Sequence, residues 1–247
     1  MPQTSTAEPT RTRRTGWFTA SALRKALSKR GCVVCEALNT AVRRSIFSFL
    51  YEGMMSVDVR EKFLAGGGFC FQHFRQAKEI EGESWADGFG VAILCENLLE
   101  RILAGLDGLQ ANRNRAKRSL SLKRRKPSFQ RLTGQRCMVC QVAQESETHY
   151  IEALEELLAD SSFAEPYRQT SGLCLIHLPA AFQFWTSPAS LALVRQLAKD
   201  HAQRLISELR NLQRKHDYQY RHEPHGADWS SSERAIEFLT GSHSAPR

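Results

Sequence analysis

The 247-residue sequence contains no long apolar run. No stretch approaches the ~20 consecutive apolar residues that a membrane-spanning helix requires. The N-terminal segment MPQTSTAEPTRTRRTG is polar and basic, and it has no apolar stretch of the kind that a secretory signal peptide contains. These two absences predict a cytoplasmic protein with no membrane partner. In that reducing compartment, paired cysteines are expected to bind metal or to act in redox chemistry rather than to form disulfides.

Strand patterns and catalytic motifs are also missing. No segment alternates apolar and polar residues between hairpin turns, as a β-sheet protein requires. The sequence has no Gly-x-Ser-x-Gly or His-Glu-x-x-His motif, and Gly66-Gly67-Gly68 lacks the Lys-Ser/Thr that completes a phosphate loop. We therefore expect an all-α protein, assign no catalytic residue, and favour a protein that is not an enzyme.

Acidic residues are absent from one internal segment. Eight basic residues and no acidic one lie between Arg113 and Lys126. This segment carries a charge of +8 and residues 1–30 carry +6, whereas the whole chain carries only +8, so the remainder of the chain is mildly acidic at −6. The composition of 112–135 predicts a disordered linker. The basic run can contact the phosphates of a nucleic acid, but it lacks interleaved aromatic residues, so a solvated linker is the simpler interpretation.

What the sequence does contain is an internal repeat. Cys32-Val-Val-Cys35 recurs as Cys137-Met-Val-Cys140, at an offset of 105 residues. Gly68-Phe-Cys70-Phe-Gln-His73 recurs as Gly172-Leu-Cys174-Leu-Ile-His177, at an offset of 104. Two copies are too few for a solenoid, and they predict a duplicated half-domain with pseudo-two-fold symmetry.

The apolar spacing within each copy is that of amphipathic helices. Leu38, Val42, Ile46 and Phe49 form one such stripe after the first cysteine pair. Each copy is expected to form a four-helix unit, with helices near 35–52, 57–64, 70–84 and 85–106 and near 142–158, 163–169, 174–185 and 188–215. The predicted organisation is a disordered basic tail (1–24), a first metal-binding repeat (25–111), a basic linker (112–135), a second metal-binding repeat (136–219), and a loop with a short C-terminal helix (220–247).

The duplicated motifs have the composition of metal sites. Zinc prefers four ligands in a tetrahedron, drawn from thiolate sulfur and imidazole nitrogen. A Cys-x-x-Cys turn brings two sulfurs together, and Cys-x-x-His at the start of a helix does the same for a sulfur and a nitrogen. Taken copy by copy, the motifs predict two sites, the first from Cys32, Cys35, Cys70 and His73 and the second from Cys137, Cys140, Cys174 and His177.

Each predicted set is a closed Cys₃His shell, which has no position for water and therefore favours a structural ion over a catalytic one. We interpret the pattern as two structural zinc ions per chain, each tying the first helix of a copy to the third helix of the same copy. An iron–sulfur cluster in the same shells, or metal-free thiol chemistry, remains an alternative.

At these motifs the sequence resembles a bacterial family of unknown function that carries the Cys-x-x-Cys and Gly-Phe-Cys-x-x-His pattern twice. The resemblance covers about residues 25–241. It includes the two motif pairs, Leu50-Tyr51-Glu52, Gly90-Val91-Ala92-Ile93-Leu94 and the segment from Trp229 to Gly241. It implies a metal-binding helical protein and brings no known activity.

The functional hypothesis is a zinc-stabilised helical protein that acts as a binding or regulatory module, with a protein partner that the sequence does not name. One alternative is a redox or electron-transfer protein with iron–sulfur clusters in the same eight-ligand set. A second alternative is a nucleic-acid-binding protein that uses the basic linker.

Overall fold

The computed structural model describes residues 15–85, 88–116 and 137–242, and for 107–116 it describes the backbone alone. Every regular element within these ranges is helical, and none of these residues lies in a β-strand. The expected all-α class is therefore confirmed. The elements are α1 Trp17–Ala26, α2 Val33–Tyr51, η1 Gly53–Met55, α3 Val57–Ala65, α4 Phe71–Ser84, α5 Phe89–Ala116, α7 Met138–Leu158, α8 Ser161–Arg168, α9 His177–Phe184, α10 Pro188–Lys215, η2 Ala227–Ser230 and α11 Ser231–Thr240.

The segment before the first cysteine pair is helical. Residues 17–24 were expected to belong to a disordered tail, yet they form most of α1. Leu23 and Ala26 are buried, and they pack in the same apolar cluster as residues of α2 and α7. The basic residues that precede this segment, Arg11, Arg13 and Arg14, led to its assignment to the tail, although the segment itself is largely apolar. Residues 1–14 of the predicted tail lie outside the described residues.

The fourth helix of the first copy is longer than expected. Helix α5 begins at Phe89 and runs to Ala116, so it includes 112–116 of the predicted linker. The remainder of that linker, and therefore most of the predicted disorder, lies outside the described residues. Helix α10, by contrast, has the predicted bounds, because Ser187 caps its first turn by accepting a hydrogen bond from the Ser190 amide.

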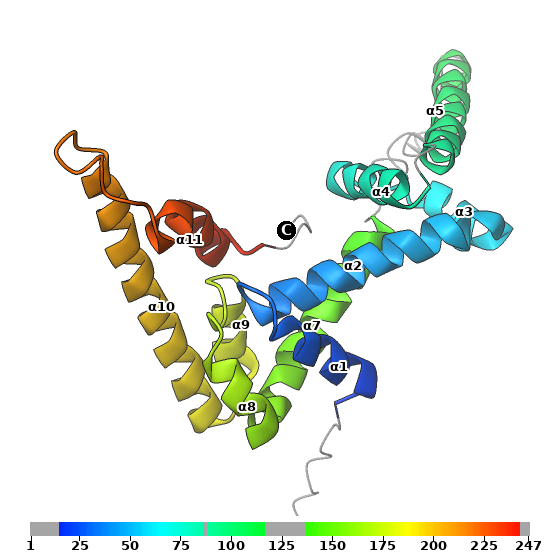
Figure 1. Ribbon diagram of the computed structural model, residues 1–247. Coiled ribbons are helices and arrows are strands. Elements are labelled where there is room, and N and C mark those ends of the chain that lie inside the picture. Colours follow the sequence, from blue (N-terminus) through cyan, green and yellow to red (C-terminus); the bar gives the residue numbers. More distant parts are fainter. Residues whose placement is uncertain (1–14, 86–87, 117–136, 243–247) are drawn as a thin grey trace, which may run out of the picture.

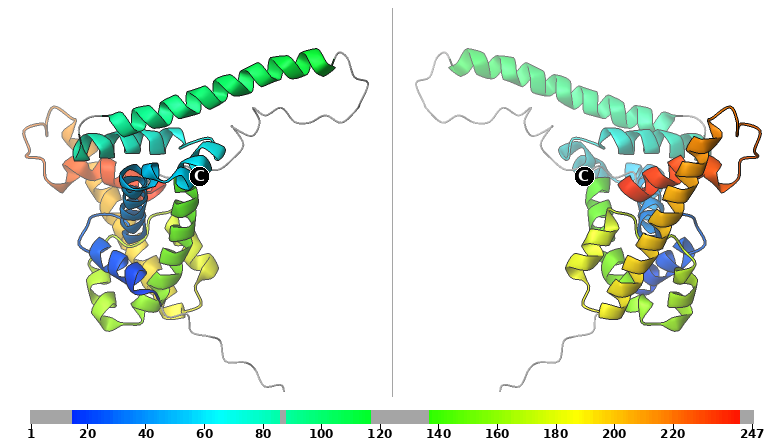
Figure 2. Two further views of the ribbon diagram at one scale, coloured as in Figure 1. Left: turned by 90° about the vertical axis from the view of Figure 1, so that its right-hand side faces the viewer. Right: turned by 90° about the vertical axis from the view of Figure 1, so that its left-hand side faces the viewer.

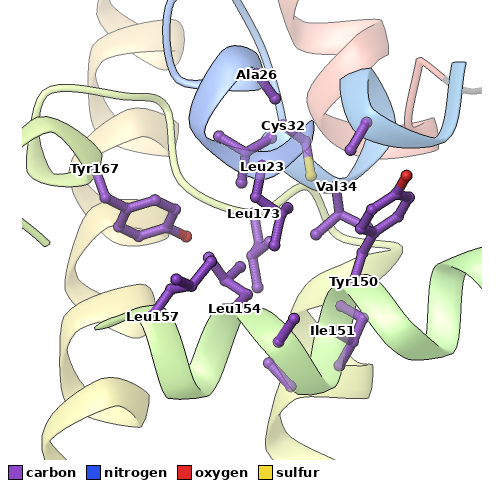
Figure 3. Close-up of a cluster of buried hydrophobic side chains, with 14 of the residues drawn as sticks. Leu23, Ala26, Cys32, Val34, Tyr150, Ile151, Leu154, Leu157, Tyr167 and Leu173 are labelled. Atoms are coloured by element: carbon purple, nitrogen blue, oxygen red, sulfur yellow. The ribbon is translucent and has the colours of Figure 1, made fainter. Parts of the chain in front are cut away.

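Two long helices, α2 and α7, form the centre of the molecule (Figure 1). They run antiparallel, so the N-terminal half of α2 lies beside the C-terminal half of α7. One apolar cluster surrounds this end and includes Leu23, Val34, Leu154 and Leu173 (Figure 3). It draws residues from both copies of the repeat.

A second apolar cluster surrounds the opposite end of α2. It contains Phe49, Phe63 and Phe69 from the first copy, with ring centroids 4.9–5.1 Å apart, together with Val139 from the second. Because each cluster joins residues of both copies, the prediction of two four-helix units is not confirmed. The two copies pack against each other along α2 and α7, and they share both apolar clusters.

The two 28-residue helices, α5 and α10, differ in what covers them. The N-terminal part of α5 packs on α3 and α4 and the rest of the helix extends away from them, whereas α11 and the short η2 helix pack on α10 (Figure 2). A buried ion pair between Lys215 and Asp228, with 3.0 Å between Nζ and Oδ2, holds the connection between α10 and η2. None of the described helices combines the length and the apolar character that crossing a membrane requires.

Candidate metal centres

The eight predicted ligand residues gather in two groups, but not in the groups that were expected. We define centre 1 as Cys32, Cys35, Cys174 and His177, and centre 2 as Cys70, His73, Cys137 and Cys140. Each centre takes its Cys-x-x-Cys pair from one copy and its Cys-x-x-His pair from the other. The prediction that each copy completes its own site is therefore wrong.

The lengths of the helices explain why each Cys-x-x-Cys pair meets the Cys-x-x-His pair of the other copy. Helix α2 has 19 residues, so at 1.5 Å per residue it carries the chain about 28 Å away from the first cysteine pair. The next helix, α3, has nine residues and spans about 13 Å, and α4 rather than α3 packs back along α2. The Cys-x-x-His pair at the start of α4 therefore stays near the C-terminal end of α2. The antiparallel α7 places its own cysteine pair, Cys137 and Cys140, at that same end.

The spacing of the ligand atoms is that of a single tetrahedral ion. In each centre these atoms all lie within 4.8 Å of one another. In centre 1 the sulfurs of Cys35 and Cys174 are 3.7 Å apart, and three sulfurs lie 3.3–3.4 Å from Nδ1 of His177. Zinc–ligand bond lengths at tetrahedral angles give about 3.8 Å between two sulfurs and about 3.6 Å between sulfur and nitrogen.

Centre 2 repeats this geometry. The sulfurs of Cys70 and Cys140 are 3.8 Å apart, and the sulfurs of Cys70, Cys137 and Cys140 lie 3.2–3.5 Å from Nδ1 of His73. Both centres thus present three sulfurs and one Nδ1 atom toward a common point. Each group can hold a metal ion.

A glycine with positive φ precedes each Cys-x-x-His pair. Gly68 (φ 85°) and Gly172 (φ 74°) occupy equivalent positions of the repeat. A Cβ atom at Gly68 would lie 2.6 Å from Leu98 Cδ1 of α5, and one at Gly172 would lie 3.1 Å from Leu197 Cβ of α10. The chain therefore needs glycine here for two reasons, the left-handed backbone and the close approach of the fourth helix of that copy.

The second nitrogen of each histidine has a different environment. Nε2 of His177 lies 3.2 Å from a carboxylate oxygen of Glu147 on α7. Nε2 of His73 is buried, and it has no hydrogen-bond partner among the residues that the structure describes. A carboxylate on the outer nitrogen fixes the ring and makes the ligand more basic, so Glu147 supports centre 1 in a way that centre 2 lacks. Sequence analysis missed Glu147, because no motif spacing marks a residue that contacts a histidine 30 positions away.

Comparison with known proteins agrees with the resemblance to a family of unknown function. The model of the family described as "Family of unknown function (DUF6062)" matches residues 23–246. The chain belongs to the DUF6062 family. Its relatives include a protein of Caldicellulosiruptor sp. (strain Rt8B.4), described as "Uncharacterized 23.9 kDa protein in xynA 3'region". This relative is 24% identical over 216 residues, which cover 85% of the chain and 95% of the relative. No solved structure matches the chain.

In centre 1 of this DUF6062 chain, three thiols and an imidazole lie in contact, and the contacts displace their pKa values in opposite directions. Burial, followed by hydrogen bonds to Cys174 and Cys35, raises the pKa of Cys32 well above its usual value. Hydrogen bonds from Cys32 and Cys35 hold the pKa of Cys174 far below it. Burial alone would lower the pKa of His177, but hydrogen bonds to Cys174, Cys35 and Glu147 outweigh burial and raise that pKa to about 11. Protons are thus shared within the group, and a cation would replace them.

Exposure distinguishes the two centres as well. All four ligands of centre 1 are buried, whereas Cys70 and Cys140 of centre 2 are partly exposed. At Cys140, burial and the neighbouring thiols Cys137 and Cys70 raise the pKa. Centre 2 therefore has the same ligand chemistry as centre 1 in a more accessible position.

Proposed function

We propose that this protein binds two zinc ions, one in each centre, and that the ions act as cross-links between the two copies of the repeat. The observation that carries the proposal is the distance set of 3.2–3.8 Å between ligand atoms, repeated in both centres. An iron–sulfur cluster would separate the cysteine sulfurs further, because several iron and sulfide atoms would lie between them. The spacing therefore favours a single ion.

The proposed role of the ions is structural. Four protein ligands complete a tetrahedral shell and leave no position for water or substrate. Structural zinc sites contribute roughly 10–16 kcal/mol in small zinc-finger peptides, whereas whole domains are stable by only about 5–15 kcal/mol. Two such cross-links would join α2, α4, α7 and α9, and each would be comparable in size with the net stability of a whole domain. Because the ions have no open position, the protein would act through its surface, as a binding or regulatory module.

Metal analysis tests this proposal. Protein purified without chelators should contain two zinc ions per chain by inductively coupled plasma mass spectrometry. Cobalt(II) substituted for zinc should give the intense visible bands of a tetrahedral thiolate site. A brown protein with iron, sulfide and absorbance near 400 nm after anaerobic purification would instead support the electron-transfer alternative. Protein with no bound metal would refute both.

A further inference from the structure

A cavity of about 590 Å³ lies beside centre 1. Its walls come from four segments that are distant in sequence: the loop before Cys32, the loop before Cys174, one face of α10, and the α11 helix with η2. A backbone hydrogen bond of 2.8 Å from the Leu175 amide to the Phe238 carbonyl joins α11 to the loop that carries Cys174. The volume is in the range of pockets that hold small molecules, and it is far larger than a single ion requires.

A buried histidine lines this cavity. His201 on α10 is 7% exposed, and its ring packs edge to face on Phe238 with 5.1 Å between centroids. Its nitrogens form no hydrogen bond with the described residues, and they are not among the fully enclosed polar atoms, so they are open to the cavity. An imidazole in this position can form a hydrogen bond to a group that fills the cavity.

The charges around the cavity favour an anion. Lys29 and Arg30 on one wall, and Arg204 one turn after His201 on another, form no ion pair with the described residues. Glu208 is neutralised by Arg234, with 2.5 Å between carboxylate and guanidinium. Burial, followed by the positive potential of Arg204 and Arg234, lowers the pKa of His201. A negative group bound between His201 and Arg204 would offset the repulsion between the protonated imidazole and the two guanidinium groups.

Two further carboxylates, those of Glu233 and Glu237, lie on the α11 side of the cavity. The Glu237 carboxylate approaches the loop before Cys32, where a Cβ atom at Gly31 would lie 3.8 Å from Oε2. These carboxylates accept hydrogen bonds and repel a second negative group. They therefore restrict the ligand to one anionic end, with hydroxyl or amine donors on the remainder.

We propose that this cavity binds a small metabolite whose phosphate or carboxylate group contacts His201 and Arg204 and whose polar remainder faces Glu237. The bound ligand would bridge α10, α11 and the two loops that carry Cys32 and Cys174. The proposal is independent of the identity of the metal, because the residues that contact the ligand are not metal ligands.

Calorimetric titration of the full-length, metal-containing protein tests the site. The probes are inorganic phosphate and lactate, each added at constant ionic strength against sodium chloride as a blank. We expect saturable binding of at least one probe. Phosphate binding that exceeds lactate binding would identify a phosphorylated ligand, and the reverse order would identify a carboxylate. In the same titration, the ring-proton signal of His201 should shift and saturate in NMR spectra.

Two variants locate the binding. Arg204→Ala removes an exposed side chain, so it should leave the fold intact and weaken binding about tenfold or more, because a charge-assisted hydrogen bond is lost. His201→Gln should weaken binding while it preserves a hydrogen-bonding side chain. Arg210→Ala, on an exposed position of the same helix outside the cavity, is the matched control and should bind like wild type. Binding of neither probe above the chloride blank, or equal binding by the Arg204→Ala and Arg210→Ala proteins, would overturn the proposal.

Discussion

Centres 1 and 2 have the same four ligand types and differ in the residues around them. Centre 1 is buried throughout, and its histidine contacts Glu147. Centre 2 has two partly exposed cysteines and a histidine whose outer nitrogen is buried without a partner among the described residues. The comparison shows that the duplication kept the ligand pattern and changed the environment of one site.

The difference in histidine contacts between the two centres can be traced to one position of the repeat. Glu147 lies seven residues after Cys140, and the equivalent position in the first copy, seven residues after Cys35, is Val42. Val42 is buried in the apolar cluster around the C-terminal half of α2. An unsatisfied buried N–H costs about 1–3 kcal/mol, which corresponds to a factor of about 5–150 in affinity. We therefore expect centre 2 to hold its ion less tightly than centre 1.

The largest effect should come from pairs of cysteine substitutions that distinguish crossed from local sites. The Cys32→Ser/Cys174→Ser protein loses two ligands of centre 1 and should retain one ion, in centre 2. The Cys32→Ser/Cys70→Ser protein loses one ligand from each centre, so both sites should be weakened and metal content should fall toward zero. Metal analysis after gel filtration measures both. Retention of one ion by the second protein, and of none by the first, would show that each copy completes its own site.

A smaller effect, confined to centre 1, is expected from Glu147→Gln. Loss of the carboxylate beside His177 should weaken the ion of centre 1 about 10–100-fold, since outer contacts of metal-bound histidines have effects of this size. Competition with a chromogenic chelator measures the change. Glu145→Gln, at an exposed position of the same helix, is the control and should have no effect. Equal weakening by both substitutions would show that Glu147 acts only through the surface charge of α7.

The wild-type protein should lose its two ions in a fixed order. Centre 2 should release first to a chelator, at least about fivefold more readily than centre 1, because of its partnerless histidine. Alkylation with N-ethylmaleimide during release, followed by peptide mass spectrometry, identifies the exposed cysteines. Cys70 and Cys140 should be labelled before Cys35 and Cys174. Simultaneous labelling of all four would indicate that the two ions leave in one cooperative step.

The smallest effect should be nearly equal at the two centres. Gly68→Ala and Gly172→Ala each place a side chain in the left-handed region, which costs about 1–2 kcal/mol. The free energy of unfolding of the metal-bound proteins, measured in denaturant, should fall by at least this amount in both, because the close approach of Leu98 or Leu197 adds to the backbone cost. Gly82→Ala is the control, since a Cβ atom at Gly82 meets nothing within 4 Å and Gly82 lies inside a helix. A loss at only one glycine would indicate that the two loops differ in strain as well as in outer contacts.

Much of the fold could be predicted from the sequence. Period-3.6 stripes and capping residues predicted most helices, and they gave the bounds of α10 because Ser187-Pro188 is a strong start signal. The stripe is weaker in α1, where only Leu23 and Ala26 of the ten residues are buried. Residues 112–116 were assigned to the linker because their charge resembles that of the residues that follow, yet they continue α5.

The eight candidate ligands could be predicted from the sequence, but their grouping was not. The repeat suggested local sites because each copy contains a complete Cys₃His set. The expected lengths of α2 and α3 were available at the same stage, and they favour a position of the Cys-x-x-His pair near the far end of the first helix, away from Cys32 and Cys35. Glu147 and His201 could not have been found in this way, because their roles depend on contacts between helices that are far apart in sequence.

The measurement that tests the central claim most directly is a crystal structure of the metal-containing protein, with anomalous diffraction recorded on both sides of the zinc absorption edge. Two anomalous peaks are predicted. One should lie between Cys32, Cys35, Cys174 and His177, and the other between Cys70, His73, Cys137 and Cys140, each at tetrahedral bonding distance from its four ligands. Peaks that join ligands of a single copy, or crystals of folded protein with no anomalous peak at either group, would contradict the account.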